Sequence, residues 1–581
     1  MAIQVSGSTV IHDSQDVQVS GMFTASSFVG DASQLTNLPA SGGTLEATAS
    51  GTLADGDTTI INTDGTVSAV ALNSSPYWFL TLGSTEADVS KARIAFDGSN
   101  NFYIAGYFAT SADPWQQGLI AKYNSSGVIQ WQRSIGISNN SHDGFYGIAV
   151  DSSGNSYAVG GLQYGPNSGN DIFIVKYNTS GVVQWQRTLG GSDHDIGMGG
   201  IALDSSGNNV YIGNYTKSSG SGNYDLHTAK YNSSGTLQWK RTLGGSGLDF
   251  NEAGIAVDSS GNAYITGGTA STGAGGYDVV IAKYNSSGTL QWQRTLGGSG
   301  NDKAVGEPAI DSSGNFYIVG NTNSGGAGGN DILIAKYNSS GTIQWQRTLG
   351  GSNTDMGTGI TIDSSDNVYI TGYTDESISP QIPMNIIIAK YNSSGDIQWQ
   401  RTLGSSTSGQ DYGYGIAADN SGNIYVTAQQ SAIGAGSLDI FIAKLPDDGS
   451  STGTFGVYTY AASSLSSAAI SLTSSSSSLT DASSSLTDAS SSYSSSTTTL
   501  TSSITSLETT NLTSENFIGV SNGAYTNGQT ATIQVTGSVD DAQSGLTAGQ
   551  AYYVQDNGTL GESGSVFAGT AVSASKIIVK G

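Results

Sequence analysis

The sequence predicts a mainly β protein: a seven-bladed β-propeller closed by an N-terminal strand, flanked by small β domains and a heptad coiled-coil stalk. Three observations support this fold class: the composition, a tryptophan that recurs every 53 or 54 residues, and four short β runs in each repeat. Of the 581 residues, 81 are glycine and only 11% are charged, which favours turn-rich β structure over helical globular domains. The 9% aromatic content is high enough for most of the chain to fold.

The central repeat contains enough β runs to form one sheet per unit. One full unit extends from Gly254 to Gly298 and contains the runs GIAV, NAYITG, DVVIAKY and TLQWQRTL, each rich in β-branched or aromatic residues. Four-stranded units of this length, repeated radially, are typical of a β-propeller. The recurring tryptophans are Trp78, Trp131, Trp185, Trp239, Trp292, Trp345 and Trp399.

Two tight turns recur in each unit. The Asp-x-x-Gly-Asn turn needs one residue with positive φ, and residues that tolerate this conformation occupy the position in every unit. The Asn-Ser-Ser-Gly or Asn-Thr-Ser-Gly turn also matches the N-glycosylation sequon, but no secretory signal peptide accompanies it, so we interpret it as a turn. The positive-φ positions are Asn100, Gly154, Gly207, Gly261, Gly314, Asp366 and Gly422, and the second turns start at Asn124, Asn178, Asn232, Asn285, Asn338 and Asn392.

The count of strands predicts how the ring closes. The run Tyr77 to Leu82 contains the first tryptophan but precedes any GIAV-type strand, whereas the last unit ends at Phe441 to Leu445 without a Trp-containing strand. One spare strand and one missing strand fit together, so the N-terminal run is expected to complete the seventh sheet and leave no long open edge. We therefore assign residues 71–449 to the propeller.

The repeat resembles a known family, the bacterial β-propeller repeat (SBBP). The motifs that carry the resemblance are Asp171-Ile172-Phe173, Leu189-Gly190-Gly191-Ser192 and Gly147-Ile148-Ala149-Val150-Asp151. The resemblance implies the propeller fold and implies no catalytic activity.

Most basic residues are repeat positions. A periodic cation can indicate ligand capture, but a copy in every unit beside a tryptophan is more simply a side-chain stem packed on an indole, which is the interpretation we favour. These positions are Lys122, Lys176, Lys230, Lys283, Lys336, Lys390 and Lys444, with Arg133, Arg187, Arg241, Arg294, Arg347 and Arg401.

Residues 450–515 are rich in Ser and Thr and contain a strict seven-residue period. This heptad predicts a coiled-coil stalk, and we expect a parallel homotrimer by analogy with viral fibres. The second row of core positions is mostly Ala or Ser, and Ser and Thr are mediocre helix formers, so a disordered linker is the alternative. The period consists of Leu465, Leu472, Leu479, Leu486, Tyr493, Leu500 and Leu507.

The two ends of the chain are assigned to small β domains. Residues 1–70 alternate apolar and polar positions, as short strands do, and form the predicted N-terminal anchor; residues 516–581 form the predicted C-terminal domain. The segment 25–39 resembles one found in tail-fibre and other virion proteins of phages, especially cyanophages, and segments 545–555 and 566–580 are similar to domains that end proteins of this class. The resemblance implies a place on a virus particle.

An acidic residue recurs in the loop after each Trp-containing strand. Because Ca²⁺ prefers oxygen ligands, these residues are candidate metal ligands, with Ca²⁺ as the one candidate cofactor. The alternative, which we favour, is that each carboxylate accepts backbone N–H groups and fixes its loop. The residues are Asp143, Asp195, Asp249, Asp302, Asp355 and Asp411.

In a propeller, these loops and the loops that join the second and third strands lie on one rim. They contain most of the variation between units, including several aromatic residues. Aromatic side chains with polar tips can stack on sugar rings, so they are candidate ligand-binding residues. Packing between blades is the alternative. The residues are Trp115, Tyr164, Tyr215, Tyr224, Tyr277 and Tyr373.

Charge and motifs exclude several functions. The net charge of −25 disfavours nucleic acid, no apolar run is long enough to span a membrane, and no catalytic motif occurs, so we expect no enzyme. The favoured hypothesis is a trimeric virion structural fibre protein of a bacteriophage, whose propeller recognises a host-surface glycan or another virion protein. A secreted bacterial propeller or adhesin is the alternative. A glycan-degrading enzyme would need a converging carboxylate pair, which the repeated aspartates do not single out.

Overall fold

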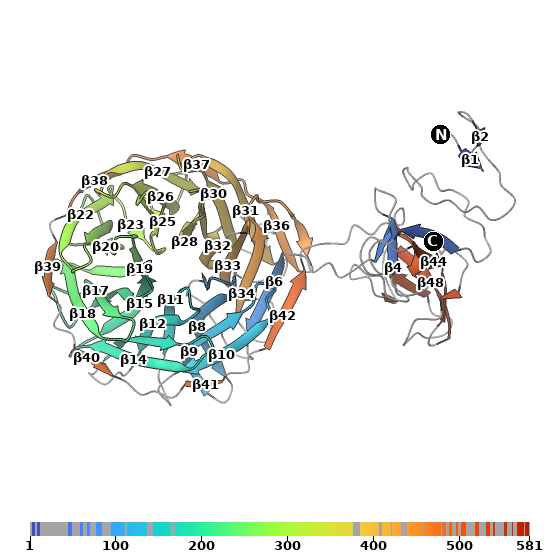
Figure 1. Ribbon diagram of the computed structural model, residues 1–581. Helices are drawn as coiled ribbons and strands as arrows, with labels where there is room; N and C mark the ends of the chain where they lie inside the picture. The colour runs from blue at the N-terminus through green and yellow to red at the C-terminus, as the bar shows by residue number, and fades with distance from the viewer. Residues whose placement is uncertain are drawn as a thin grey trace. The chain divides into compact units, whose positions relative to one another are not determined.

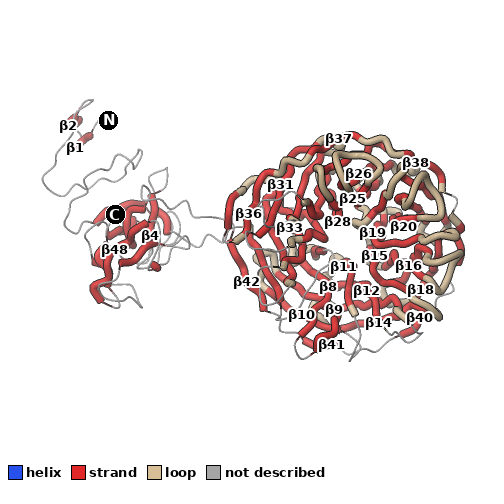
Figure 2. The backbone as a smooth tube through the Cα atoms, turned by 180° about the vertical axis from the view of Figure 1, so that it is seen from behind, coloured by secondary structure: helices blue, strands red, loops and turns tan. Residues whose placement is uncertain are grey.

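The computed structural model describes two compact units, residues 76–507 and residues 1–75 with 508–581, which are treated separately below. The described residues are 3–5, 8–11, 44–48, 58–61, 67–69, 77–83, 94–110, 113–135, 143–163, 169–375, 384–405, 410–419, 421–431, 438–455, 457–477, 479–483, 487–490, 495–497, 501–506, 517–521, 530–534, 539–540, 551–554, 560–561, 566–573 and 576–579. Their regular elements are strands (Figure 2), and none of these residues belongs to a helix long and apolar enough to cross a membrane.

The larger unit is a propeller of seven antiparallel sheets arranged around an axis (Figure 1), as the sequence predicts. In each blade the first strand lies nearest the axis and the Trp-containing strand lies outermost of the four. The blades are, in order, β7 (Ile94–Phe96), β8 (Phe102–Thr110), β9 (Asp113–Tyr123) and β10 (Ile129–Ile135); β11 (Gly144–Val150), β12 (Ser156–Leu162), β13 (Asp171–Tyr177) and β14 (Val183–Gly190); β15 (Asp195–Leu203), β16 (Asn209–Thr216), β17 (Asp225–Asn232) and β18 (Leu237–Gly244); β19 (Asp249–Val257), β20 (Ala263–Thr269), β21 (Asp278–Tyr284) and β22 (Leu290–Gly297); β23 (Asp302–Ala304) with β24 (Ala309–Ile310), β25 (Phe316–Thr322), β26 (Asp331–Tyr337) and β27 (Ile343–Gly350); β28 (Asp355–Ile362), β29 (Val368–Thr374), β30 (Asn385–Tyr391) and β31 (Ile397–Ser405); and β32 (Tyr412–Ala418), β33 (Asn423–Gln430), β34 (Asp439–Pro446) and β6 (Trp78–Gly83).

The ring closes through the N-terminal strand, which confirms that prediction. β6 pairs antiparallel with β34, so that Trp78 lies opposite Lys444 and Leu82 opposite Ile440. The first and last blades are thereby joined, because β6 belongs to the seventh sheet although it precedes the first blade in sequence.

The predicted turns are also confirmed. All seven positions expected to have positive φ have it, including the two that are not glycine, Asn100 at 59° and Asp366 at 60°. In the second turn the Asn side chain accepts two backbone N–H groups: at Asn338, those of Ser340 at 3.1 Å and Thr342 at 2.9 Å. The asparagine side chains therefore form hydrogen bonds within their own turns, as the turn interpretation requires.

The apolar core is divided into seven clusters, one between each pair of neighbouring blades. The cluster between the fifth and sixth blades, for example, combines Ile334 and Leu349 of one sheet with Ile370 and Ile387 of the next. Each sheet therefore buries both faces, and no blade contains a core of its own.

The described part of residues 450–515 is not helical, so the predicted coiled-coil stalk is wrong there. A short hairpin strand, β35 (Gly453–Phe455), leads into seven strands that run around the outside of the propeller (Figure 1) and add one further strand to each blade. We call these seven strands the belt: β36 (Tyr458–Ala462), β37 (Ser466–Ala469), β38 (Thr473–Ser476), β39 (Thr480–Ser483), β40 (Thr487–Ser490), β41 (Ser495–Thr497) and β42 (Thr501–Ser506).

The seven-residue period is the distance along the belt from one blade to the next. The belt starts on the sixth blade, runs backwards through the fifth to the first, and ends on β6 of the seventh. The belt residues that lie opposite the repeated arginine, or opposite Leu80 in the seventh blade, are spaced by seven without exception: Ala462, Ala469, Ser476, Ser483, Ser490, Thr497 and Ile504.

The physical reason for the error is that a period of seven is compatible with a helical seam but does not require one. Ser and Thr favour a helix poorly, and a short strand followed by a connection repeats just as regularly when its partner strands are evenly spaced. The predicted homotrimer depended on the helical seam, and no described residue tests it. Of the seven heptad residues, Leu486, Tyr493, Leu500 and Leu507 lie outside the described residues.

The smaller unit contains strands from both ends of the chain. Strands of the N-terminal and C-terminal segments, which the sequence assigned to two separate domains, pair within one sheet: Leu45 lies opposite Ile533, and Thr58 opposite Val520. The segment 25–39, which carried the phage resemblance, lies outside the described residues. The sheets are β1 (Ile3–Val5) with β2 (Ser8–Ile11); β3 (Thr44–Thr48), β44 (Thr530–Gln534), β43 (Phe517–Ser521), β4 (Thr58–Ile61) and β5 (Val67–Ala69); and β45 (Val539–Asp540), β49 (Lys576–Val579), β48 (Val566–Ser573), β46 (Ala551–Val554) and β47 (Leu560–Gly561).

Candidate functional site

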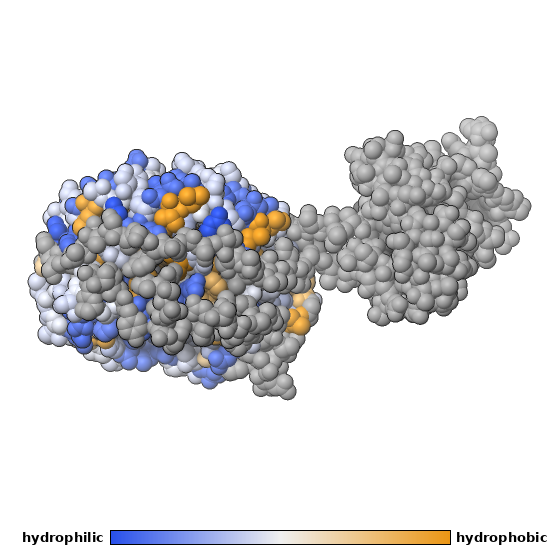
Figure 3. Space-filling view, turned by 90° about the horizontal axis from the view of Figure 1, so that it is seen from below, coloured by the Kyte–Doolittle hydropathy of each residue, from blue (hydrophilic) through white to orange (hydrophobic). Residues whose placement is uncertain are grey.

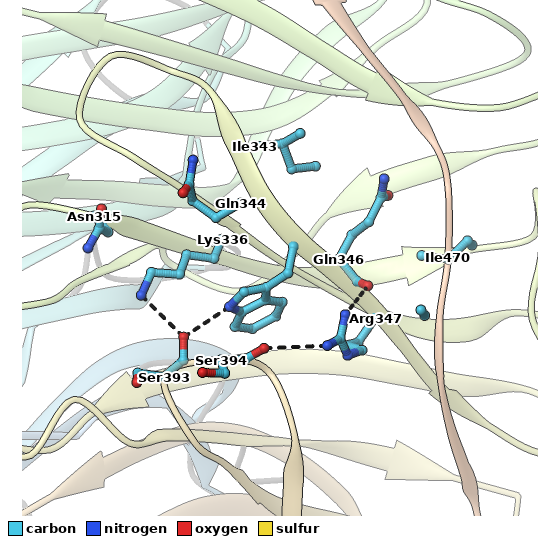
Figure 4. A pocket seen from close by; sticks show the side chains of 11 residues that line it. Asn315, Lys336, Ile343, Gln344, Gln346, Arg347, Ser393, Ser394 and Ile470 are labelled. Carbon is cyan, nitrogen blue, oxygen red and sulfur yellow. Dashed lines mark hydrogen bonds between the residues drawn. The ribbon is translucent and has the colours of Figure 1, made fainter.

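The repeated basic residues connect each blade to the next one. Figure 4 shows the junction of the fifth and sixth blades, where Trp345 Nε1 and Lys336 Nζ both donate to the carbonyl oxygen of Ser393, at 3.1 and 3.3 Å. Arg347 Nε donates to the carbonyl oxygen of Gly395 at 2.8 Å. These side chains line a groove of about 710 Å³, but their donors are already bonded to the neighbouring turn.

We call this contact the clamp, and it recurs around the ring. The same indole nitrogen donates to a carbonyl oxygen of the following turn at 2.9 to 3.2 Å in five other blades, and Lys444 Nζ reaches back to Ser125 O at 3.3 Å to join the seventh blade to the first. The five further pairs are Trp131 with Thr179, Trp185 with Ser233, Trp239 with Ser286, Trp292 with Ser339, and Trp399 with Asp447. The predicted packing on an indole holds for the arginines, since Arg347 Cζ lies 5.6 Å from the ring centroid of Trp345. The lysines differ from the prediction, because Lys336 Nζ lies over the ring of Tyr317, at 4.8 Å from its centroid, and not over the indole.

The clamp also explains a glycine in the turn. Gly395 has φ of 80°, and a Cβ there would lie 2.7 Å from Cδ2 of Trp345. Glycine is thus required twice, because it adopts left-handed φ without strain and because it lets the indole approach the backbone.

The opposite side of the ring carries the longer loops. There the loop between the second and third strands of a blade meets the loop that leads to the next blade: Asp249 N donates to Tyr224 O at 2.8 Å, and Asp302 N to Tyr277 O at 2.7 Å. We call this side the loop rim. Its two sets of loops adjoin, as the sequence analysis expected.

The six predicted acidic residues begin the innermost strands or directly precede them on the loop rim, and all are buried, with at most 2% exposure. Asp249 Oδ2 accepts Gly245 N at 2.7 Å and Ser271 Oγ at 2.6 Å, while Oδ1 accepts the hydroxyl of Thr269. Asp143 accepts Gln163 N at 3.0 Å. The remaining four accept backbone N–H groups in the same way: Asp195 from Gly191, Asp302 from Gly298, Asp355 from Gly351, and Asp411 from Ser405.

These contacts match the loop-fixing alternative better than a cation site. Among the described residues, no three His, Asp or Glu side chains gather as a metal centre would require. Burial raises the pKa of Asp411 to about 6, although the donors of Ser405 oppose this shift.

A second row of carboxylates on the loop rim was missed. Burial, followed by the charge of Asp249, raises the pKa of Asp225 to about 6. The carboxylate of Asp225 fills the space that a Cβ of Gly244 would need, so the glycine at the end of the outer strand is a packing requirement. The signal was present, since an Asp begins the third β run in most units: Asp171, Asp225, Asp278, Asp331 and Asp439.

Four of the six predicted aromatic residues form contacts on the loop rim. The rings of Tyr215 and Tyr224 meet edge to face with centroids 5.4 Å apart. Tyr277 meets Phe250 in the same way at 5.5 Å, and Tyr373 meets Tyr412 at 4.7 Å. All four tyrosines are half-buried.

Packing between blades accounts for part of this arrangement. Tyr373 and Tyr412 belong to different blades, and Lys303 Nζ of the fifth blade lies 4.3 Å from the ring centroid of Tyr277 in the fourth. Trp115 lies in β9, where its side chain is not described, and Tyr164 lies outside the described residues.

Sequence analysis missed the partner side chains of these aromatics. Phe250, Lys303 and Tyr412 occupy the position directly after the rim aspartate. This position varies from blade to blade, with Ile196 and Met356 in two others. A variable position beside an invariant one is the signal that could have found them.

On the face shown in Figure 3, apolar residues form small separate groups within a mainly hydrophilic surface.

Comparison with known proteins agrees with this fold. Three stretches, residues 238–273, 344–378 and 398–429, match the family model of the beta-propeller repeat, SBBP. Each stretch combines the outer strand of one blade with the first two strands of the next. The chain is therefore a propeller-repeat protein.

A viral relative shows weaker similarity. The chain is 22% identical over 438 residues to an uncharacterized WD repeat-containing protein of Acanthamoeba polyphaga mimivirus. The alignment covers 60% of this chain and 30% of the mimivirus protein, so the chain spans less than a third of that relative's length.

Proposed function

We propose that this protein is a non-enzymatic recognition protein whose loop rim binds carbohydrate on a cell surface. The observation that carries the proposal is the set of three aromatic contacts, Tyr215 with Tyr224, Phe250 with Tyr277, and Tyr373 with Tyr412. A half-buried tyrosine presents an apolar ring face and a polar hydroxyl, which together suit the apolar face and hydroxyl edge of a sugar.

The loop rim suits a ligand better than the turn side, which is the side of the ring that carries the Asn-Ser-Ser-Gly turns. On the turn side, the repeated Lys, Trp and Arg donors already bond the neighbouring blade, as in the clamp of Lys336, Trp345 and Arg347. The loop rim combines aromatic rings with loops that differ between blades, and such variation is expected where one ligand contacts each blade differently.

Binding to an array of bacterial surface glycans tests the proposal with the whole protein. Replacing both Tyr215 and Tyr224 by alanine should weaken glycan binding at least tenfold, because both rings of one contact are removed. Val182→Ala is the matched control, since Val182 is a 55% exposed apolar side chain on the turn side. Equal binding by the rim variant and the wild type would refute a carbohydrate site at this contact.

We further propose that the protein is a structural component of a bacteriophage particle. The sequence resemblance of both chain ends to phage virion proteins supports this placement. The mimivirus relative supports only a viral origin. The alternative is a secreted bacterial adhesin with the same rim chemistry. Mass spectrometry of purified particles and of the bacterial surface separates the two, because the protein should occur in the particles and be absent from uninfected cells.

A further inference from the structure

The belt strands form their backbone pairing with the propeller and not with one another. Each belt strand pairs with the outer strand of one blade; apart from the β35–β36 hairpin, no described belt strand pairs with another. A segment without a sheet of its own, which adds one strand to an existing edge, binds in the manner of an extended peptide ligand.

A leucine of the belt enters three of the junctions between blades. Leu465, Leu472 and Leu479 are only 5 to 8% exposed, although the belt lies on the outside of the ring. They join the apolar clusters between the fifth and sixth, the fourth and fifth, and the third and fourth blades respectively. The leucines therefore anchor the belt between blades and are spaced by the same seven residues as the strands.

A glutamine of the propeller recognises the backbone of each of these leucines. Gln346 Nε2 donates to Leu472 O at 3.0 Å, and Leu472 N donates to Gln346 Oε1 at 3.1 Å, so both backbone polar groups of the leucine are paired by one side chain. Gln293 donates to Leu479 O at 2.9 Å and Gln400 to Leu465 O at 2.7 Å. This residue is the second glutamine of the Gln-Trp-Gln-Arg run, the one between the clamp residues.

Small hydroxyl side chains complete the contact. The hydroxyls of Tyr391 and Ser467 lie 3.2 Å apart, and those of Thr295 and Ser475 lie 3.0 Å apart. Tyr337 donates to Ser474 Oγ at 3.4 Å. Serine at these positions reaches a buried tyrosine or a strand threonine without displacing the blade.

We propose that the outer edges of the blades form a peptide-binding surface, specific for an extended segment with leucine at every seventh residue and small hydroxyl residues between, and that the belt is its detachable ligand. The surface holds the belt through a short strand ladder at every blade and, at the fourth, fifth and sixth blades, also through a leucine anchor and its glutamine. Covalent connection to the propeller is therefore not required, and the same segment binds when supplied as a separate peptide.

The test uses the full chain with two protease sites, one inserted between Ser451 and Thr452 and one after Leu507, so that cleavage frees residues 452–507 without removing them. Native mass spectrometry should show the cleaved segment still bound to the propeller. An excess of isotope-labelled peptide of residues 452–507 should then replace it. A peptide with serine in place of Leu465, Leu472 and Leu479 should fail to replace it.

Propeller variants test the recognition by glutamine. Gln346→Leu removes both contacts with Leu472 and should accelerate exchange of the segment roughly tenfold, as expected for the loss of about 1.4 kcal/mol of hydrogen bonding. Gln344→Leu is the matched control, because Gln344 Nε2 bonds Thr342 O of its own chain segment at 3.0 Å and should leave exchange unchanged.

Three results would overturn the proposal. The first is a cleaved segment that leaves at once and does not rebind. The second is a segment that is retained but never exchanges with labelled peptide. The third is exchange with the serine-substituted peptide at the rate of the native one.

Discussion

The blades and the belt are both repetitive, but they become ordered in different ways. A blade repeat of about 53 residues forms four paired strands and buries apolar side chains against both neighbouring sheets. A belt repeat of seven residues forms one short strand that pairs with a blade, and three of the repeats also bury a leucine between blades. A sequence period therefore reports the spacing of whatever a segment binds, and not only the segment's own secondary structure.

This difference predicts whether each region affects the global free energy of unfolding or only local opening. The clamp joins one blade to the next, so its loss should lower the free energy of unfolding of the whole ring. The belt lies outside, so its contacts should govern local opening instead, because peripheral elements with few buried contacts open independently of the core.

The largest expected effect comes from removing the indole of one clamp. Trp345→Ala should lower the free energy of unfolding by about 3–5 kcal/mol, because a large aromatic contact and its hydrogen bond to Ser393 are lost together. Urea unfolding followed by circular dichroism measures it. Gln344→Ala, one residue away and exposed, should change stability by less than about 0.5 kcal/mol. A Trp345→Ala protein with wild-type stability would show that the clamp does not join the blades.

A smaller effect is expected from filling the space beneath the indole. Gly395→Ala should cost about 2–4 kcal/mol, because it combines left-handed φ with overlap of the new Cβ and Trp345. Gly314→Ala is the matched control: its φ is 78°, close to the 80° of Gly395, but no atom lies within 4 Å of its Cβ position. It should cost about 1–2 kcal/mol. Equal losses of unfolding free energy in the two variants would remove the indole contact from the explanation.

The fold of the blades could be predicted because its signals are local. Tight turns need particular residues at positive φ, and Asn100 and Asp366 stood out for that reason even though glycine occupies the position in the other units. The spare run at Trp78 and the missing strand after Leu445 identified the closure by counting alone. The clamp could not be found in this way, since Trp345 and Ser393 are separated by 48 residues and meet only when two blades pack.

The belt was misinterpreted because the heptad was judged as a property of its own segment. The unused signal was numerical: the sequence contains seven heptad residues and predicts seven blades. Leu465 and Leu472 each contact one glutamine, Gln400 and Gln346. These glutamines lie on neighbouring outer strands, and seven residues of the belt connect one to the next.

The candidate site was only partly predictable. The tyrosines of the loop rim were found from their position in variable loops, but Phe250 and Tyr412, their partners, lie on the innermost strands and were missed. The aspartates were found as a set, and the loop-fixing alternative describes their contacts. Which carboxylate meets which loop depends on the packing of successive blades, which one repeat in isolation does not reveal.

The third blade departs from the repeat and offers a pH-dependent test. His227 is fully buried where the fourth blade has Val280, and burial, with the charge of Lys240, lowers its pKa to about 3. Because an unfolded histidine titrates near 6.5, the unfolded state binds more protons between these values, and stability falls as pH decreases through this range. From pH 7 to 5, His227 should cost about 2 kcal/mol of unfolding free energy.

His227→Val should remove this dependence. The difference in unfolding free energy between variant and wild type should grow by about 2 kcal/mol between pH 7 and 5, measured by urea unfolding at each pH. His194→Val is the control, because His194 lies on the loop rim and is exposed. A constant difference across this pH range would mean that His227 titrates in the fold as it does in the unfolded chain.

The smallest expected effect belongs to the belt and is local. Leu472→Ser removes one anchor between the fourth and fifth blades and should lower the free energy of local opening of β37 and β38 by about 1–2 kcal/mol. Ser471→Ala, at the exposed neighbouring position, should leave it unchanged. Hydrogen exchange followed by mass spectrometry separates the two regions, since belt peptides should exchange roughly tenfold faster in the leucine variant while peptides from β26 and β27 keep their wild-type rate. Equal acceleration in belt and blade would show that the belt is a cooperative part of the ring, and the distinction between the two regions would then fail.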